Sequence, residues 1–375
     1  MPVFSQGRVS GQRFRVQDGR AIFGPEHLEK LADAAIGRQR VAMGDGSQMG
    51  WIAGGHVLDT DFTFETCAVN GTLQFALRID DVRPPAALKR AYYEQEVAAF
   101  AKENPSGFAS KKQKREARFL AKDRIEQEAK EGKWLRRRAF PALWDGDSGE
   151  LLFGSTSADV TDRLHSLFRQ TFGKSLEWMG ATRRARAIAE GFAGLDMPVI
   201  VNPAFADEVA WALDENNCDF LGNEFLLWLW HFTEHVSDTV KLRDDSECVV
   251  MLTRTLTLDC PRGQTGKETI SSDMPGRLVE AIKAAQSGKL PRKAGLTLVR
   301  HHQVYEVTLQ AESLAFSAKL PKPESGEDRA VIDERVDSIR ACLETLDLLY
   351  EAFLSRRLSD AWGRELGTIR GWLNK

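Results

Sequence analysis

The order of apolar and polar residues predicts a β-rich N-terminal part. Residues 7–16 alternate between the two kinds, which is typical of a strand with one buried face. Residues 62–69 and 72–79 flank Asn70-Gly71, and an Asn-Gly pair supplies the positive φ angles that a two-residue hairpin turn requires. Helical spacing of apolar residues over 25–36 predicts a short amphipathic helix.

The period of the pattern changes at the proline pair Pro84-Pro85, where two long helices are expected. The first helix ends at the breaker sequence 104–107, and the second runs from about 110 to 137. At 1.5 Å per residue the second helix would be roughly 40 Å long. Few apolar residues face the gap between the helices, so we expect a helical hairpin that projects from the body as an arm.

Strands and helices resume after this hairpin, which indicates that it is inserted into one α+β layer. Further strands are expected at 142–153 (two strands around an Asp-Gly turn), 247–258, 296–302, 303–309 and 313–319, and further helices at 155–172, 220–232 and 331–358. The predicted fold class is α+β, with mixed antiparallel sheets, packed helices and the projecting basic hairpin. The expected parts are the β-rich start of a central domain (1–83), the arm (84–138), the return to the central domain (139–194), a second α+β region (195–326) and a C-terminal helical segment (327–375).

Composition indicates a soluble, cytoplasmic protein. The chain has 375 residues, of which 42% are hydrophobic and 28% charged. Its start lacks the apolar stretch of a secretory signal, and its longest apolar run, 225–230, is far shorter than the roughly 20 residues of a membrane span. Five scattered cysteines without a CxxC pair predict reduced thiols and neither disulfides nor a zinc cage.

Charge is distributed unevenly along the chain. Residues 89–138 carry 15 Lys or Arg and 8 Asp or Glu, a balance of +7, although the whole chain is at −3. Cations in the second helix recur at i, i+3, i+4, i+7 and i+11 and form one stripe, which is a candidate surface for a polyanion. A solvated spacer is the alternative. The predicted DNA-binding residues are Lys89, Arg90, Lys111, Lys112, Lys114, Arg115, Arg118, Lys122, Arg137 and Arg138.

One short motif keeps an enzymatic alternative open. His231, Glu234 and His235 form an H-x-x-E-H pattern, which on a helix places two imidazoles on one face, as in inverted zincins. A zinc hydrolase would need a further acidic ligand, for which Glu280 is a candidate. The simpler interpretation is the polar end of a buried helix.

Other patterns are weaker. Asp59, Asp61 and Glu65, at alternating strand positions, could form a metal-dependent nuclease cluster, but surface carboxylates are the simpler interpretation. The segment 263–267 fails as a phosphate loop, because Pro261 and Glu268 stand where glycine and Ser or Thr are required. The glycine-rich segment 43–51 likewise lacks the dinucleotide spacing. We expect no cofactor, and the zinc hydrolase and the nuclease stay open as alternatives.

Several markers in fixed order resemble the bacterial recombination-associated family RdgC. Met49-Gly50-Trp51 comes first, followed by a Pro-x-x-aliphatic-Lys start at Pro85 and a long helical segment rich in Lys and Glu. That segment ends at 135–140, Leu-Arg-Arg-Arg-Ala-Phe, which is similar to the family's Leu-Leu-Pro-Arg-Ala-Phe. The resemblance covers most of the chain and is specific over 49–180.

The resemblance implies a non-enzymatic, nucleoid-associated DNA-binding protein. Members of the family fold as an α+β horseshoe and pair into a ring-shaped homodimer, which passes duplex DNA with little sequence preference and limits access of the RecA recombinase. The arm would be the tip that closes the ring, with Phe140 as its gate beside Arg138. Two features depart from the family: Arg137 replaces its proline, and residues 181–247 are additional.

Overall fold

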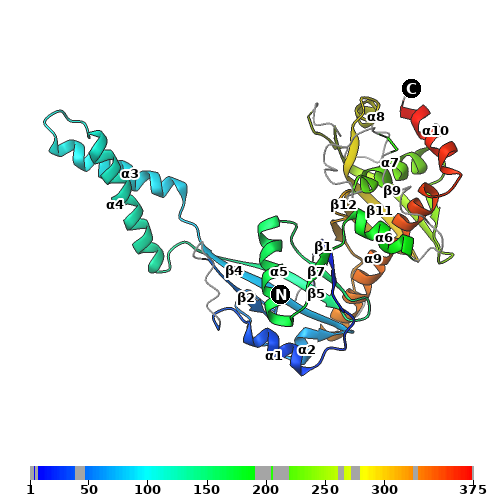
Figure 1. Ribbon diagram of the computed structural model, residues 1–375, viewed down its shortest axis with the longest axis horizontal. Helices are drawn as coiled ribbons and strands as arrows, with labels where there is room; N and C mark the ends of the chain where they lie inside the picture. Colours follow the sequence, from blue (N-terminus) through cyan, green and yellow to red (C-terminus); the bar gives the residue numbers. More distant parts are fainter. Residues whose placement is uncertain are drawn as a thin grey trace.

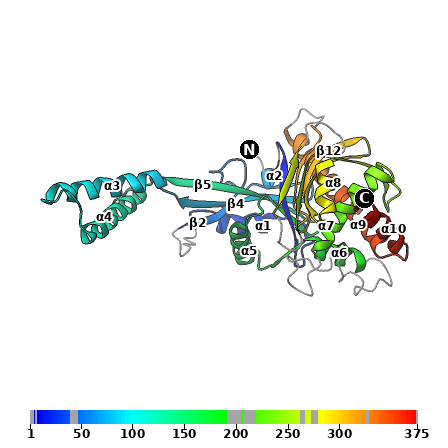
Figure 2. The same cartoon turned by 90° about the horizontal axis from the view of Figure 1, so that it is seen from above.

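The structure, a computed structural model, describes residues 4, 7–38, 47–190, 204–205, 219–260, 266–271, 279–323 and 328–373. These residues adopt an α+β fold in which helices pack on a large antiparallel sheet, as the sequence predicts. Figures 1 and 2 show three parts in a row, which we call the arm, the central part and the C-terminal part. The arm comprises residues 86–134, and the C-terminal part comprises the elements that follow residue 180.

The sheet runs through the central and C-terminal parts. Its central strands are β1 (Val9–Val16), β2 (Gln48–Ile52), β3 (Ala68–Val69), β4 (Thr72–Val82), β5 (Leu135–Asp145), β6 (Glu150–Phe153) and β7 (Leu176–Trp178). Its C-terminal strands are β8 (Thr239–Lys241), β9 (Glu247–Asp259), β10 (Glu268–Ser271), β11 (Leu290–Arg300), β12 (Gln303–Gln310) and β13 (Phe316–Lys319). The order is β10-β9-β11-β12-β13-β1-β6-β5-β4-β2, with β3 beside β4, β7 beside β1 and β8 beside β9.

Strand β1 connects the two parts. Residues 9–11 pair with β13, whereas residues 12–15 pair with β6. At the change of partner, a Cβ on Gly11 would lie 2.2 Å from the carbonyl oxygen of Phe153. The crossing therefore requires a residue without a side chain.

Two hydrophobic clusters fill the interior. Helices α1 (Pro25–Asp33) and α5 (Ala158–Phe172) cover one face of the central strands, where Trp51, Phe75 and Trp144 are fully buried. The opposite face contributes alternate residues such as Ala76 and Leu143 to the second cluster, because successive side chains of a strand point to opposite faces.

The second cluster lies largely in the C-terminal part. Its helices are α6 (Ala181–Glu190), α7 (Phe220–His235), α8 (Val279–Gln286), α9 (Asp328–Arg357) and α10 (Trp362–Leu373). Helix α7 packs against β11 and β9, and its Trp228 and Trp230 are fully buried. None of the helices in the described residues is both long and apolar enough to cross a membrane.

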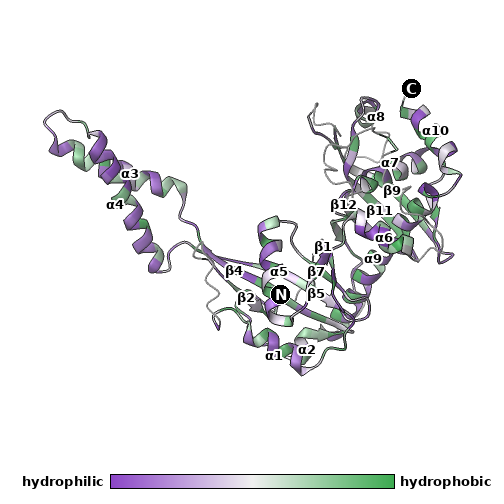
Figure 3. Ribbon diagram, viewed as in Figure 1, coloured by the Kyte–Doolittle hydropathy of each residue, from purple (hydrophilic) through white to green (hydrophobic). Residues whose placement is uncertain are grey.

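The arm consists of α3 (Ala86–Glu103) and α4 (Lys111–Lys130), which project beyond the end of β4 and β5 (Figure 1). Ser110 and Gln113 cap α4 reciprocally, with N···O distances of 3.3 and 2.9 Å. The two helices meet through small residues, since Ala117 and Ala121 are the residues of α4 that are buried. Figure 3 shows the arm as predominantly hydrophilic.

The structure corrects two predicted elements. The second arm helix ends at Lys130 and not near residue 137, because residues 135–145 pair along their whole length with β4. The arm is therefore shorter than the predicted 84–138, and residues 135–138 belong to the sheet. Residues 64–67 form a short helix, α2 (Phe64–Cys67), and not the expected strand, since Thr63 caps the amide of Thr66. The Asn70-Gly71 turn is confirmed by φ angles of 46° and 68°.

Candidate nucleic-acid interface

The basic residues of α4 are concentrated in its first half, at the free end of the arm. Residues 111–122 carry six Lys or Arg and one Glu, whereas residues 123–134 carry three and four, respectively. Two of the three cations in residues 123–134 have carboxylate partners: Arg124 lies 3.7 Å from Glu128, and Lys133 lies 3.2 Å from Glu131. The local excess of +5 therefore belongs to the free end.

Most cations of this first half have no carboxylate partner among the described residues. This holds for Lys111, Lys112, Lys114, Arg115 and Arg118, all of which are exposed. Lys122 differs, because its Nζ lies 3.4 Å from Glu126. Unpaired exposed cations remain free to contact an anion.

The position of these cations works against the stability of α4 itself. Its first turn contains no acidic residue, although the partial positive charge of a helix N-terminus favours acids and disfavours Lys and Arg. A bound phosphate would be stabilised by both the side chains and the helix N-terminus. The arrangement is thus better suited to an anionic partner than to helix stability.

A groove of about 460 Å³ runs between the two arm helices beside the basic stripe. Lys89 and Tyr93 of α3 face Arg118 and Lys122 of α4 across it, and the Arg118 guanidinium lies 5.6 Å from the centre of the Tyr93 ring. The structure therefore brings Lys89 together with the α4 cations at a groove that Glu126, the partner of Lys122, also lines.

Three predicted contact residues do not join this surface. Arg90 pairs with Glu94 at 2.7 Å. Arg137 and Arg138 lie on β5, where they pair with Asp80 and Asp81 across the strand at 3.7 and 3.6 Å. Their charge is therefore offset within the sheet.

Phe140 also lies in the sheet, which contradicts its predicted position at the tip of the arm. It pairs with Leu77 of β4, is half-buried, and lies 6.3 Å from the Phe153 ring. The strongly exposed aromatic residues of the arm are instead Phe108 and Phe119, which are 80% and 70% exposed. Neither residue is among the predicted contact residues. An aromatic residue among charged helical neighbours, as at Phe119, is the sequence pattern that could have indicated an exposed ring.

The His231 motif is built into a packed helix end. His231 is buried, and desolvation, together with the neighbouring His235, lowers its pKa to about 4. The Trp372 ring lies 5.4 Å from His231 and 5.7 Å from His235, and Glu234 accepts a 2.8 Å hydrogen bond from Trp230. Among the described residues no group of three or more His, Cys, Asp or Glu could hold a metal ion. His231 thus packs inside the C-terminal part, whereas His235 is exposed at the end of α7.

The other candidate sites give no cluster either. Asp59 lies in a loop and accepts hydrogen bonds from the amides of Gly55 and Asp61, while Glu65 is on α2, so the alternating strand spacing is wrong. Glu280 is an exposed residue of α8. Residues 43–46 and 261–265 lie outside the described residues.

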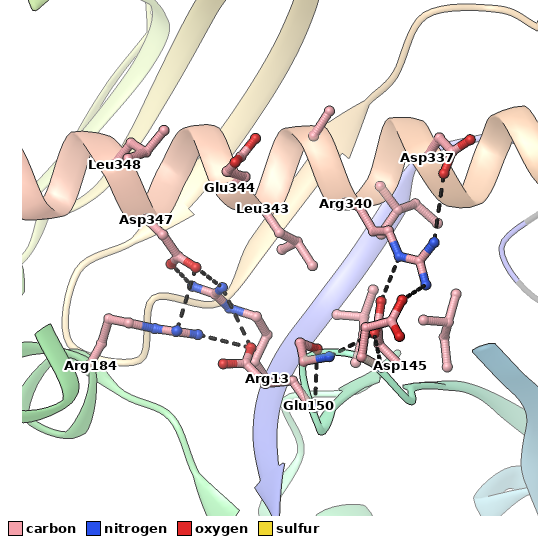
Figure 4. Close-up of a pocket in the computed structure, with 16 residues that line it drawn as sticks. Arg13, Asp145, Glu150, Arg184, Asp337, Arg340, Leu343, Glu344, Asp347 and Leu348 are labelled. Carbon is pink, nitrogen blue, oxygen red and sulfur yellow. Dashed lines mark hydrogen bonds and ion pairs between the residues drawn. The ribbon is translucent and has the colours of Figure 1, made fainter. Parts of the chain in front are cut away.

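A cavity of about 710 Å³ separates α9 from β1, β5 and β6 (Figure 4). Arg13 makes two hydrogen bonds to Asp347, at 2.8 and 2.6 Å, and Arg184 lies 2.9 Å from Glu150 and 3.4 Å from Asp347. These arginines are almost fully buried and paired. We interpret the cluster as a structural joint between the central and C-terminal parts.

A comparison of the chain with protein-family models and with curated proteins finds no match to either. The case for an interface therefore depends on the geometry and charge of the arm, together with the family markers in the sequence.

Proposed function

We propose that this protein binds DNA, preferentially duplex DNA, without sequence preference, and that α4 of the arm contacts the phosphates. The observation that carries the proposal is the set of five exposed cations without carboxylate partners at the free end of the arm. Lysines and arginines that neutralise phosphates give affinity but read no bases. The protein would have no enzymatic role.

The resemblance to RdgC extends the proposal to a biological role. A horseshoe-shaped protomer that pairs into a homodimeric ring would enclose DNA and restrict a RecA-type recombinase on the nucleoid. The projecting arm supports this idea, because it presents its cations away from the acidic remainder of the chain. The position of Phe140 in β5 argues against a gate at the tip formed by that residue.

A salt-titrated gel shift tests the proposal. If about six phosphates are engaged, the logarithm of the affinity should fall with the logarithm of the salt concentration with a slope of about −5. Replacing Lys111, Lys112, Lys114, Arg115 and Arg118 by Ala should bring the slope near −1, since about one contact remains.

A matched control removes the same number of charges elsewhere. The residues replaced by Ala are exposed lysines outside the arm, namely Lys30, Lys241, Lys283, Lys319 and Lys322. This variant should keep most of the wild-type affinity and slope. Equal losses in both variants would mean that total charge matters and the arm does not, and a flat salt response of the wild type would exclude the proposal.

A further inference from the structure

Phe119 occupies an unusual position in the middle of α4. The buried residues Ala117 and Ala121 define the side of α4 that faces α3, and Phe119 lies on the opposite side, where 70% of its surface is exposed. Burying a phenylalanine side chain stabilises a fold by about 1.5–3 kcal/mol. Because Phe119 is exposed, the folded protein gains little of this stabilisation. The ring is therefore available to a partner.

The neighbours of Phe119 are polarised. Residues three and four apart are neighbours on a helix surface, so Arg115 and Lys122 border the ring on one side. Lys112 and Glu126, seven residues before and after Phe119, lie nearly in line with the ring along the helix. Glu116 and Asp123 border it on the other side by the same spacing. The ring thus has a basic flank that attracts an anion and an acidic flank that repels one.

This combination selects the partner. Membrane-binding helices present a wide apolar face, and cores of protein interfaces are depleted of charge, whereas a single ring between charged residues fits neither. An exposed aromatic ring beside cations is the arrangement that stacks an unpaired base and holds the adjoining phosphates. Bases in a duplex already stack on one another, so only unpaired nucleotides present a free face.

We propose that Phe119 is a stacking site for unpaired nucleotides, so that the arm binds single-stranded segments of DNA as well as duplex. The flanking phosphates of the strand would lie on Arg115 and Lys122. The inference rests on the proposed DNA-binding function and adds a second, base-dependent contact to it.

The test compares full-length variants on a labelled oligothymidine and on a blunt duplex of equal nucleotide count. Phe119→Ala and Phe119→Leu should each weaken binding of the single strand about five-fold to a hundred-fold, because one base stack is lost. Binding of the duplex and both salt slopes should stay unchanged. Phe119→Trp should restore the affinity, and the control Leu120→Ala, next to Phe119 but turned by about 100° around the helix, should behave as wild type.

Other outcomes overturn the inference. A Phe119→Leu variant with wild-type affinity would show that any apolar side chain suffices, and equal losses on both DNAs would show that no base stacks there. A changed sedimentation coefficient of Phe119→Ala would assign the ring to contact between subunits, and lost binding to phosphatidylserine vesicles would assign it to membranes. If the wild type bound neither DNA, the proposed function itself would fail, whereas salt-dependent duplex binding without an effect of Phe119 would remove only this inference.

Discussion

At the scale of single residues, Gly11 has the clearest structural role. Strand β1 leaves β13 and joins β6 at this point, and the backbone of Phe153 approaches so closely that no Cβ fits. A side chain at this position would push β1, which connects the central and C-terminal parts, away from β6. The continuity of the sheet depends on this one missing side chain.

We predict that Gly11→Ala destabilises the protein by about 1–3 kcal/mol, because the added methyl group overpacks a buried site. Thermal unfolding followed by circular dichroism measures the loss as a lower Tm. Gly367→Ala is the matched control: this glycine lies exposed in α10 with no atom within 4 Å of a Cβ, so alanine should raise stability by roughly 0.5–1 kcal/mol. A Tm for Gly11→Ala equal to that of wild type would contradict the close approach.

The contrast between two glycines shows what the sequence can predict at this scale. Gly71 was predicted as a turn residue because its signal, the preceding Asn70 between two strand patterns, is local. Gly11 sits within an ordinary strand pattern, and its partner Phe153 lies far along the chain. The residues near Gly11 in the sequence do not predict its contact with Phe153.

At the scale of elements, α4 packs on α3 through only a few small residues and carries a charged free end. Its hydrogen-bonded cap and the contact of Tyr92 with Glu128, at 2.9 Å, hold it in place. The lysines of its first turn add nothing to this stability, because they oppose the helix dipole. Function and stability therefore make opposite demands on the same residues.

This conflict gives a prediction for Lys111→Glu combined with Lys112→Glu. Acidic residues in the first turn should stabilise α4 by about 0.3–1 kcal/mol each, so the Tm should stay equal or rise. DNA affinity should nevertheless fall, since two phosphate contacts become repulsive. Melting curves and gel shifts on the same preparation measure both effects, and a parallel loss of stability and binding would indicate a structural role for the lysines.

The end of α4 shows why the boundaries of helices and strands are hard to predict from the sequence. The run Leu135-Arg-Arg-Arg138 continues the helical composition of the preceding segment, and the sequence predicted helix there. In the structure these residues pair with Val82 to Ile79 of β4, and that partner lies about 55 residues away in the sequence, where the local pattern gives no sign of it. The basic stripe itself was predicted well, because helical spacing is a local property. The pairing of Arg137 and Arg138 with Asp80 and Asp81 depends on the contact between β4 and β5, which the local pattern does not reveal.

At the scale of the whole molecule, the continuous sheet and helix α9 join the two hydrophobic clusters. Helix α9, about 45 Å long, contacts both parts: Asn70 of the central part donates a 2.8 Å hydrogen bond to Asp337, and Tyr350 donates one of 3.0 Å to the carbonyl of Ala181. Between these contacts the half-buried Asp347 pairs with the buried Arg13 and Arg184. The direction in which the arm points relative to the C-terminal part depends on this joint.

Asp347→Asn tests the joint, because it leaves two buried arginines with Glu150 as their remaining counter-charge. Breaking a buried ion pair typically costs about 3–5 kcal/mol, and we expect the lower end, since Glu150 lies 3.8 Å from Arg13. The control Asp147→Asn, at an exposed residue of the same cavity, should change stability by less than about 0.5 kcal/mol. Denaturant unfolding at pH 7 measures both values.

The pH dependence gives this prediction its sign. Burial alone would raise the pKa of Asp347, but the charges of Arg13 and Arg184 outweigh burial and hold that pKa below the ordinary value of 3.8. The carboxylate therefore stabilises the folded protein fully above pH 3.8 and loses this contribution as the pH falls through its lowered pKa. The difference between wild type and Asp347→Asn should be constant from pH 5 to 7 and shrink only in stronger acid. A difference that already disappears near pH 5 would mean that Asp347 is not held in its ionised form by Arg13 and Arg184.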